Sequence, residues 1–232
     1  TTLATNAAAS FANVCSVNYG ADGAGSTAYA LNVVTAASGL VDTATGEAVT
    51  MSVDASGNIV GKTATSGATV FTISVSSAGV VTLDQARAVQ HSDGSNANDT
   101  VALAANSISL TATATDKDGD SASQPVNLGA GFVFTDDAPS VTASGTAAST
   151  LTVDESDLAT NASASFANVF TVNYGADGAG STAYALNVVN AASGLIDTAT
   201  GQAVTMSVVN GQIVGTAGGN TVFTISVSAS GV

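Results

Sequence analysis

The chain has 232 residues, 45% of them hydrophobic, and carries 17 acidic residues against three basic ones, for a net charge of −14. That charge excludes a nucleic-acid-binding surface, because phosphates would be repelled rather than neutralised, and it disfavours contact with anionic membranes. No run approaches the roughly 18–20 apolar residues of a membrane span, so no membrane insertion is expected. A single cysteine, Cys15, excludes a disulfide within the chain.

Short β-branched runs broken by Gly, Asn and Asp predict an all-β chain. In chain order, alternation of polar and apolar residues predicts strands at Asn13–Tyr19, Tyr29–Val34, Ala48–Val53, Thr69–Val75, Ser107–Thr115 and Phe132–Thr135. Asp54–Asn58 and Val209–Gln212 have the composition of hairpin turns, and Leu83–Gln90 is predicted to form a short helical turn. Several short antiparallel strands predict a β-sandwich that is Ig-like in architecture, although the Cys and Trp typical of immunoglobulins are missing.

One segment of the sequence occurs twice. Ala4–Val53 and Ala159–Val208 align without gaps at an offset of 155 positions and agree at 44 of 50 of them. The motif TVFTISVS then recurs at Thr69–Ser76 and Thr221–Ser228, now at an offset of 152, and we expect the length difference to fall in hairpin loops. Solenoid repeats span about 20–50 residues, so a period this long predicts that each copy is a whole domain.

A boundary between the copies is predicted at Asp136–Pro139, because a proline removes a donor from the strand ladder. We therefore expect residues 1–138 to form one Ig-like repeat that lacks its first strand, and residues 139–232 to form the N-terminal part of the next repeat. The second copy has no residues matching Val81–Asp137. Its open edges need a cover, supplied either by a following segment of the same protein or by a neighbouring chain.

The densest acidic cluster follows the predicted strand SISLTATAT. Asp116, Asp118 and Asp120 fall within five residues, and Gly119 permits a turn between them. Three such carboxylates repel one another unless a cation neutralises them, and oxygen ligands at alternate positions suit Ca²⁺. The spacing is not that of an EF-hand, since Asn127 stands where that motif has a glutamate. A solvated hairpin tip is the alternative interpretation.

More carboxylates flank the predicted boundary. Asp136 and Asp137 precede it, and Asp154, Glu155 and Asp157 follow near the start of the second copy. In a sandwich, a loop at one end can meet the linker, so carboxylates from both could share ions and stiffen the joint.

The repeated GADGAGS loops add Asp22 and Asp177 as weaker candidates. The alternative for each is a turn aspartate that caps its own backbone.

Enzymatic interpretations find little support. His91 is the single histidine, and the chain has no HExxH, CxxC or P-loop motif. His91, Ser92 and Asp93 are adjacent in sequence, whereas a catalytic triad needs proximity in space. The GADGAG glycines precede no predicted helix, so a dinucleotide fingerprint fails its structural context.

The series TATATDKDGD, FVFTDDAPSV and LTVDES, followed by FTVNYGADGAGSTAYAL, resembles the extender repeats of giant type-I-secreted RTX adhesins of the biofilm and ice-binding group. The resemblance covers essentially the whole chain. It implies Ig-like sandwiches stacked end to end with Ca²⁺ in and near the linkers. Carried onto this sequence, the ligands would be Asp116, Asp118, Asp120, Asp136, Asp137, Asp154 and Glu155.

The sequence and the resemblance together predict a non-catalytic spacer on the outside of a bacterial cell, whose partners are the adjacent repeats of the same chain. The alternative is a subunit of a self-assembling extracellular filament or surface layer, in which a neighbouring chain completes the partial domain. A third hypothesis, a ligand-binding domain at the tip of an adhesin, has less support, because the sequence has no cluster of aromatic residues typical of a binding surface.

Overall fold

The computed structural model describes residue 3 and residues 5–232, and it divides into two compact units. The first unit comprises residues 1–138 with 174–179, and the second comprises residues 139–173 and 180–232. The strands of the first unit are β1 (Thr5–Ser10), β2 (Ala24–Val33), β3 (Ala37–Val41), β4 (Ala48–Val53), β5 (Ile59–Thr63), β6 (Thr69–Val75), β7 (Val80–Gln85), β8 (Thr100–Ala102), β9 (Ile108–Asp116), β10 (Ser121–Asn127) and β11 (Val133–Thr135). Those of the second are β12 (Ser140–Ala143), β13 (Phe170–Asn173), β14 (Ala192–Ile196), β15 (Ala203–Val209), β16 (Gln212–Ala217) and β17 (Asn220–Ile225).

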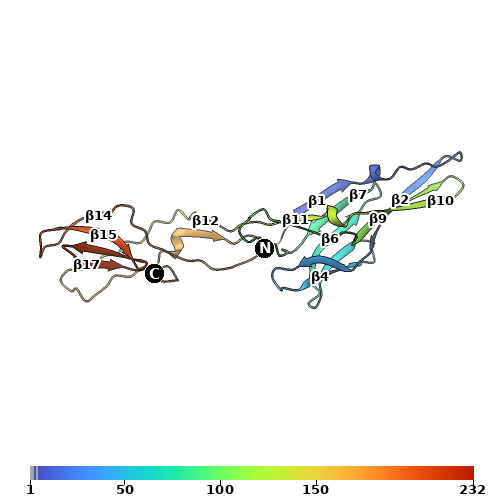
Figure 1. The fold of residues 1–232 in the computed structure, drawn as a ribbon. Helices are drawn as coiled ribbons and strands as arrows, with labels where there is room; N and C mark the ends of the chain where they lie inside the picture. Colours follow the sequence, from blue (N-terminus) through green and yellow to red (C-terminus); the bar gives the residue numbers. More distant parts are fainter. Residues whose placement is uncertain (1–2, 4) are drawn as a thin grey trace. The chain divides into compact units, whose positions relative to one another are not determined.

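The first unit is built on a six-stranded antiparallel sheet in the order β1-β7-β6-β5-β4-β3 (Figure 1). Strands β3 to β7 follow one another in the sequence, so this part is a meander of hairpins, and β1 pairs with β7 at one edge. Two further sheets, β10-β9-β2 and β11-β8, complete the unit. Strand β2 packs across β4, β5 and β6, which makes the unit two-layered.

The core lies between these layers. Alternate residues in the first half of β9 are buried, as expected for a strand with one face on the core. The buried side chains of the core include Leu31, Val49, Ile59, Phe71, Ile73, Ile108 and Phe134. Phe71 of β6 and Phe134 of β11 meet with ring centroids 5.7 Å apart and tilted by 53°. The prediction of an all-β fold built from antiparallel sheets is confirmed.

Two predicted strands coincide with β4 and β6 in both bounds, and the strand predicted at Ser107–Thr115 corresponds to β9. The predicted hairpin turn at Asp54–Asn58 is also present, closed by a hydrogen bond from the Asp54 N–H to the Asn58 carbonyl. In the described residues, three-residue 3₁₀ turns are the longest helical elements, and none is long or apolar enough to cross a membrane.

The helical turn predicted at Leu83–Gln90 is wrong. Leu83 to Gln85 continue β7, which pairs with β1 on one side and β6 on the other. Val89 then forms an isolated bridge with Asp42. The Ala, Gln and Arg residues of this segment favour helix locally, but the two flanking strands outweigh so small a preference.

In the second unit, the sheet β14-β15-β16-β17 repeats β3-β4-β5-β6. The two length differences between the copies fall in hairpin turns, as predicted. Five residues connect β4 to β5, whereas Asn210 and Gly211, both with positive φ, connect β15 to β16. Five residues connect β5 to β6, whereas Gly218 and Gly219 connect β16 to β17. The φ > 0 pair at Asn210–Gly211 suits a two-residue hairpin turn.

Strands form in each copy only where a partner strand is present. Residues 179–188, the counterpart of β2, form no strand, because β2 pairs with β9 and the sequence holds one copy of β9. Conversely, β13 pairs with β12, whereas its counterpart in the first copy, residues 15–18, forms no strand. The strand predicted at Asn13–Tyr19 is therefore absent from the first unit.

One glycine in each copy makes room for an aromatic ring. A Cβ on Gly61 would lie 2.3 Å from Cε1 of Phe71, and a Cβ on Gly215 would lie 2.4 Å from Cε1 of Phe223. Both glycines sit in a strand opposite the phenylalanine of the neighbouring strand. The pairing explains why both residues occur in both copies.

Candidate metal centres

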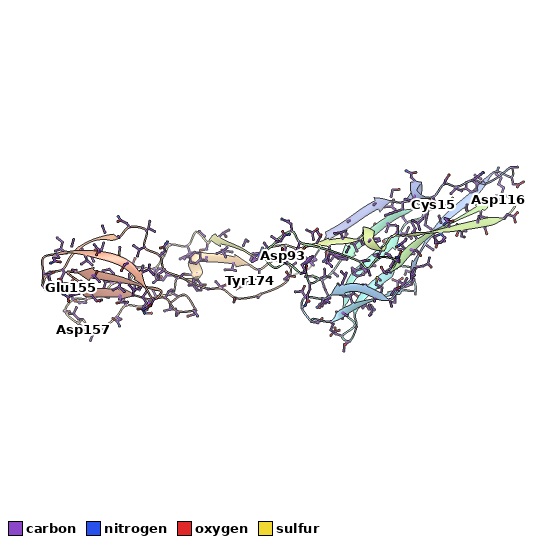
Figure 2. The ribbon with its side chains drawn as sticks, in the orientation of Figure 1. Cys15, Asp93, Asp116, Glu155, Asp157 and Tyr174 are labelled. Atoms are coloured by element: carbon purple, nitrogen blue, oxygen red, sulfur yellow. The ribbon has the colours of Figure 1, made fainter. Side chains whose placement is uncertain are left out.

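The hairpin between β9 and β10 carries the first acidic cluster. The Asp116 N–H donates to the Asp120 carbonyl at 3.0 Å, and Gly119 takes a φ of 106° at the turn. The N–H groups of Gly119 and Asp120 donate to Oδ1 of Asp116 at 3.1 and 2.9 Å. Figure 2 shows Asp116 at the far end of this hairpin.

The pKa of Asp116 lies below its ordinary value. The largest cause is a side-chain hydrogen bond with Asp118, followed among the lowering causes by the N–H groups of Gly119 and Asp120. The N–H groups of Gly119 and Asp120 favour the ionised form of this carboxyl group, which is the state that binds a cation.

The loop before β2 brings a third carboxylate to this hairpin. Because Ala24 pairs with Asp116 at the end of the β2–β9 ladder, the preceding residues lie beside the turn. Asp22, Asp116 and Asp118 can each place a carboxylate oxygen within 4.8 Å of the other two. Lys117 also reaches this loop, since its Nζ lies 4.0 Å from the Cβ position of Gly23. One lysine leaves most of the negative charge of three carboxylates uncompensated.

A second cluster forms where the chain leaves β11. Asp136, Asp137 and Asp177 satisfy the same 4.8 Å criterion, and Asp136 is the least exposed of the three. The backbone N–H of Asp136 donates to the Asp99 carbonyl at 2.8 Å, and that of Asp137 donates to Oδ1 of Asp136 at 2.9 Å. The N–H of Ala176 donates to both oxygens of Asp137, at 3.1 and 2.9 Å.

The loop that supplies Asp177 lies within the first unit, which includes residues 174–179. A Cβ on Gly175 would lie 2.6 Å from Oδ2 of Asp137, so only glycine permits this approach. Gly175 also has φ of 76°, a conformation that glycine adopts without strain.

Asp22 and Asp177 occupy the same position of the repeat, at an offset of 155. Each belongs to a different cluster, and each joins two aspartates from another part of the chain. Both residues ranked among the weaker candidates by sequence, yet each is the member of its cluster that comes from a segment distant in the sequence from the other two. The signal in the sequence was the intact repetition of GADGAG.

The remaining predicted ligands lie outside the two clusters. Asp120 is in the first hairpin but contributes its backbone to the turn. Asp154 accepts from the Ser156 N–H at 2.8 Å, and Asp157 accepts from the Thr160 hydroxyl at 2.6 Å, so both cap local turns. Side-chain hydrogen bonds with Ser156 and Thr160 lower the pKa of Asp154 and Asp157. Glu155 lies on the same exposed loop of the second unit (Figure 2).

The His91–Ser92–Asp93 sequence does not assemble a triad. The hydroxyl of Ser92 contacts Oδ2 of Asp99 at 3.3 Å, and the backbone N–H groups of Ser92 and Asp93 donate to the same oxygen. His91 instead faces Phe134 and Asp136.

Comparison with known protein families places most of the chain in one of them. The family model described as "Domain of unknown function (DUF5801)" matches residues 1–129 and 150–232. Residues 130–149, which include Asp136 and Asp137, lie between the matched segments. No curated protein and no solved structure matches the chain significantly.

Proposed function

The chain belongs to the DUF5801 family, which it matches in both copies of its repeat, and we propose that it is a non-catalytic spacer whose domains are stiffened by calcium. Such a spacer holds another part of its protein at a distance from a bacterial cell surface. The resemblance to extender repeats of secreted adhesins supports this proposal, as do the strongly acidic composition and the near-identity of the copies.

The observation that carries the proposal is the placement of Asp22 and Asp177. The same repeat position, on the same loop, gathers with two aspartates in each of two clusters. Local turn capping explains one carboxylate at a time and gives no reason for three to converge. A shared cation does, because it converts repulsion among the three into attraction.

Calcium is the ion that suits the first cluster best. Asp22, Asp116 and Asp118 offer only oxygen donors, on a hairpin tip and a loop that are mostly exposed. Ca²⁺ takes about 6–8 oxygen ligands in flexible geometry and keeps water in the positions the protein leaves open. Bound there, it would tie the β9–β10 hairpin to the loop before β2 and restrict the motion of both.

Calcium is therefore expected to raise the melting temperature of the chain relative to the same protein in chelator. With a dissociation constant of about 10 μM and about 1 mM calcium, each site adds roughly 2.7 kcal/mol to the free energy of unfolding. Differential scanning calorimetry measures the shift, and an unchanged midpoint would exclude calcium as the stiffening ion.

Asp118→Asn should remove a large part of this calcium-dependent increment, because it takes one oxygen donor and one charge from the first cluster. Asp93→Asn is the matched control. It removes the same charge from an exposed loop outside both clusters, where the carboxylate caps Ser95. The control should keep the full calcium response, and equal losses in the two variants would indicate a general charge effect instead.

A second candidate function is a subunit of an extracellular filament or layer, and the second unit supplies an observation that favours it. Residues buried in the first unit are open at matching positions of the second. Val70 is fully buried whereas Val222 is 44% exposed, and Leu40 is 2% exposed whereas Leu195 is 54% exposed. An uncovered apolar sheet face of this kind is a surface that another chain can complete.

For the filament candidate, self-association is expected to rise with concentration and to fall sharply in Val222→Asn. Val189→Asn is the control, because Val189 is the most exposed valine outside a strand and its substitution should change nothing. Sedimentation velocity distinguishes the outcomes. A species that stays monomeric at all concentrations would favour the spacer alone, whereas association that survives Val222→Asn would place the contact elsewhere.

A further inference from the structure

The second acidic cluster has a neighbour that the first one lacks, a buried imidazole. His91 follows the bridge between Val89 and Asp42, and its side chain is 7% exposed. Its Nδ1 lies 3.5 Å from Oδ1 of Asp136, one of the cluster carboxylates. Its Nε2 lies 3.3 Å from the carbonyl oxygen of Phe134.

These contacts fix the tautomer of the ring. A carbonyl oxygen only accepts, so Nε2 carries the hydrogen that it donates to Phe134. In the neutral imidazole, Nδ1 then holds a lone pair. It is buried without a hydrogen-bond partner and points at a carboxylate oxygen, which is also an acceptor. Two acceptors facing each other in a buried site repel unless a cation lies between them.

A proton or a metal ion can serve as that cation, and the surroundings favour a metal. Three carboxylates converge on the side of Asp136, far more negative charge than one imidazolium neutralises. The orientation of the ring is also the one seen in metal sites, where a ligating histidine donates its other N–H to a backbone carbonyl or carboxylate. The Phe134 carbonyl fills that role here.

We propose that His91, Asp136, Asp137 and Asp177 form a site for a transition-metal dication, with Nδ1 of His91 as its nitrogen ligand. This inference rests on the proposed cation binding and assigns the second cluster to a different class of metal. Imidazole suits Zn²⁺ and its neighbours in the first transition row, whereas sites built from oxygen alone suit Ca²⁺. The first cluster, Asp22, Asp116 and Asp118, has no such nitrogen.

An open cleft provides a route to the site. It has a volume of about 280 Å³ and is lined by all four proposed ligands together with apolar side chains of β7 and β11, among them Leu83 and Val133. A metal ion can reach the carboxylates from solvent without unfolding of the unit, and water can fill the coordination positions that the protein leaves open.

Nitrogen NMR of the intact chain tests the proposal directly, because the chain has a single histidine. With ¹⁵N-labelled histidine, titration with Zn²⁺ is expected to shift the Nδ1 resonance to that of a metal-bound nitrogen while Nε2 keeps its hydrogen. ¹¹³Cd²⁺ in place of Zn²⁺ should add a one-bond coupling to Nδ1. An Nδ1 that stays free or simply protonated at saturating metal overturns the proposal.

Variants separate this proposal from the calcium proposal. His91→Gln is expected to weaken Zn²⁺ binding by about tenfold or more while leaving calcium binding at the first cluster unchanged. Asp22→Asn should do the reverse. Zn²⁺ binding that His91→Gln leaves intact overturns the assignment of His91 alone. Failure of the chain to bind either ion, measured by calorimetric titration, overturns both proposals.

Discussion

Replacing Arg87 with methionine is expected to lower the free energy of unfolding by about 3–5 kcal/mol, because it leaves a buried carboxylate without its cation. Nε of Arg87 donates to Oδ1 of Asp42 and Nη2 donates to Oδ2, both at 2.8 Å. Asp42 is fully buried, whereas the Arg87 side chain is 32% exposed. The pair joins the β3–β4 turn to the segment after β7, so its loss loosens one end of the main sheet.

The burial of the two partners is unequal, and the costs of removing them should differ accordingly. Asp42→Asn leaves the positive charge on Arg87, which water can solvate, so we expect a smaller loss of about 1–3 kcal/mol. Urea unfolding at neutral pH measures both. If the two variants lost equal free energy of unfolding, the argument that the buried Asp42 depends on the pair more than the exposed Arg87 does would be wrong.

The same pair predicts a pH dependence. The pKa of Asp42 lies below its ordinary value of 3.8, chiefly because of the side-chain hydrogen bond from Arg87 and despite its burial. A lowered pKa in the folded state means that the stabilisation is fully present above that ordinary value and is lost as pH falls through the folded one. In Arg87→Met, this part of the acid sensitivity should disappear.

The second copy contains a control for these measurements. Asp197 stands at the position of Asp42 and keeps the hydrogen bonds to the N–H and hydroxyl of a threonine, Thr200. It is only half-buried, and the sequence has one copy of the segment that carries Arg87. Asp197→Asn should therefore cost less than about 1 kcal/mol. A cost comparable with that of Asp42→Asn would mean that Asp197 has a partner outside its unit.

Strands were predictable where the signal is local and one face is buried. Alternate residues are buried over most of β4, and polar and apolar residues alternate along most of β6, although Val70 and Phe71 are both buried there. The absence of a strand at residues 15–18 was not predictable, because the same sequence pattern pairs with β12 in the second copy and has no partner strand in the first. The helical turn predicted at Leu83–Gln90 was wrong for a related reason, because strand pairing on both sides of β7 outweighs the local preference for helix.

The candidate sites divide in the same way. The hairpin cluster around Asp116 and Asp118 lies within a few residues of sequence, so its composition alone marked it. The β2–β9 ladder brings Asp22 to that cluster, and the packing of β11 brings Asp136 to His91. Neither contact can be recognised from the local sequence. Sites assembled from distant segments need the sheet register before they can be recognised.

Phe71→Ala should destabilise the first unit by about 3–5 kcal/mol, whereas Phe223→Ala, at the matching position of the second, should cost far less. Phe71 is fully buried against Phe134, in the layer formed by β11. Phe223 is half-buried, because the sequence has no second copy of β11 to cover it. Hydrogen exchange monitored by mass spectrometry reports each unit separately, through the amides of β6 and β17.

Comparing the destabilisation caused by Phe71→Ala with that caused by Phe223→Ala shows whether the sheet of the second unit is covered in solution. If Phe223→Ala proves nearly as costly as Phe71→Ala, the ring is packed against something that the chain itself does not supply, and another copy is the partner available in a pure sample. Dilution should then remove the excess cost, because it dissociates the copies. If the cost stays small at every concentration, the face is open in solution, and the spacer accounts for the chain without assembly.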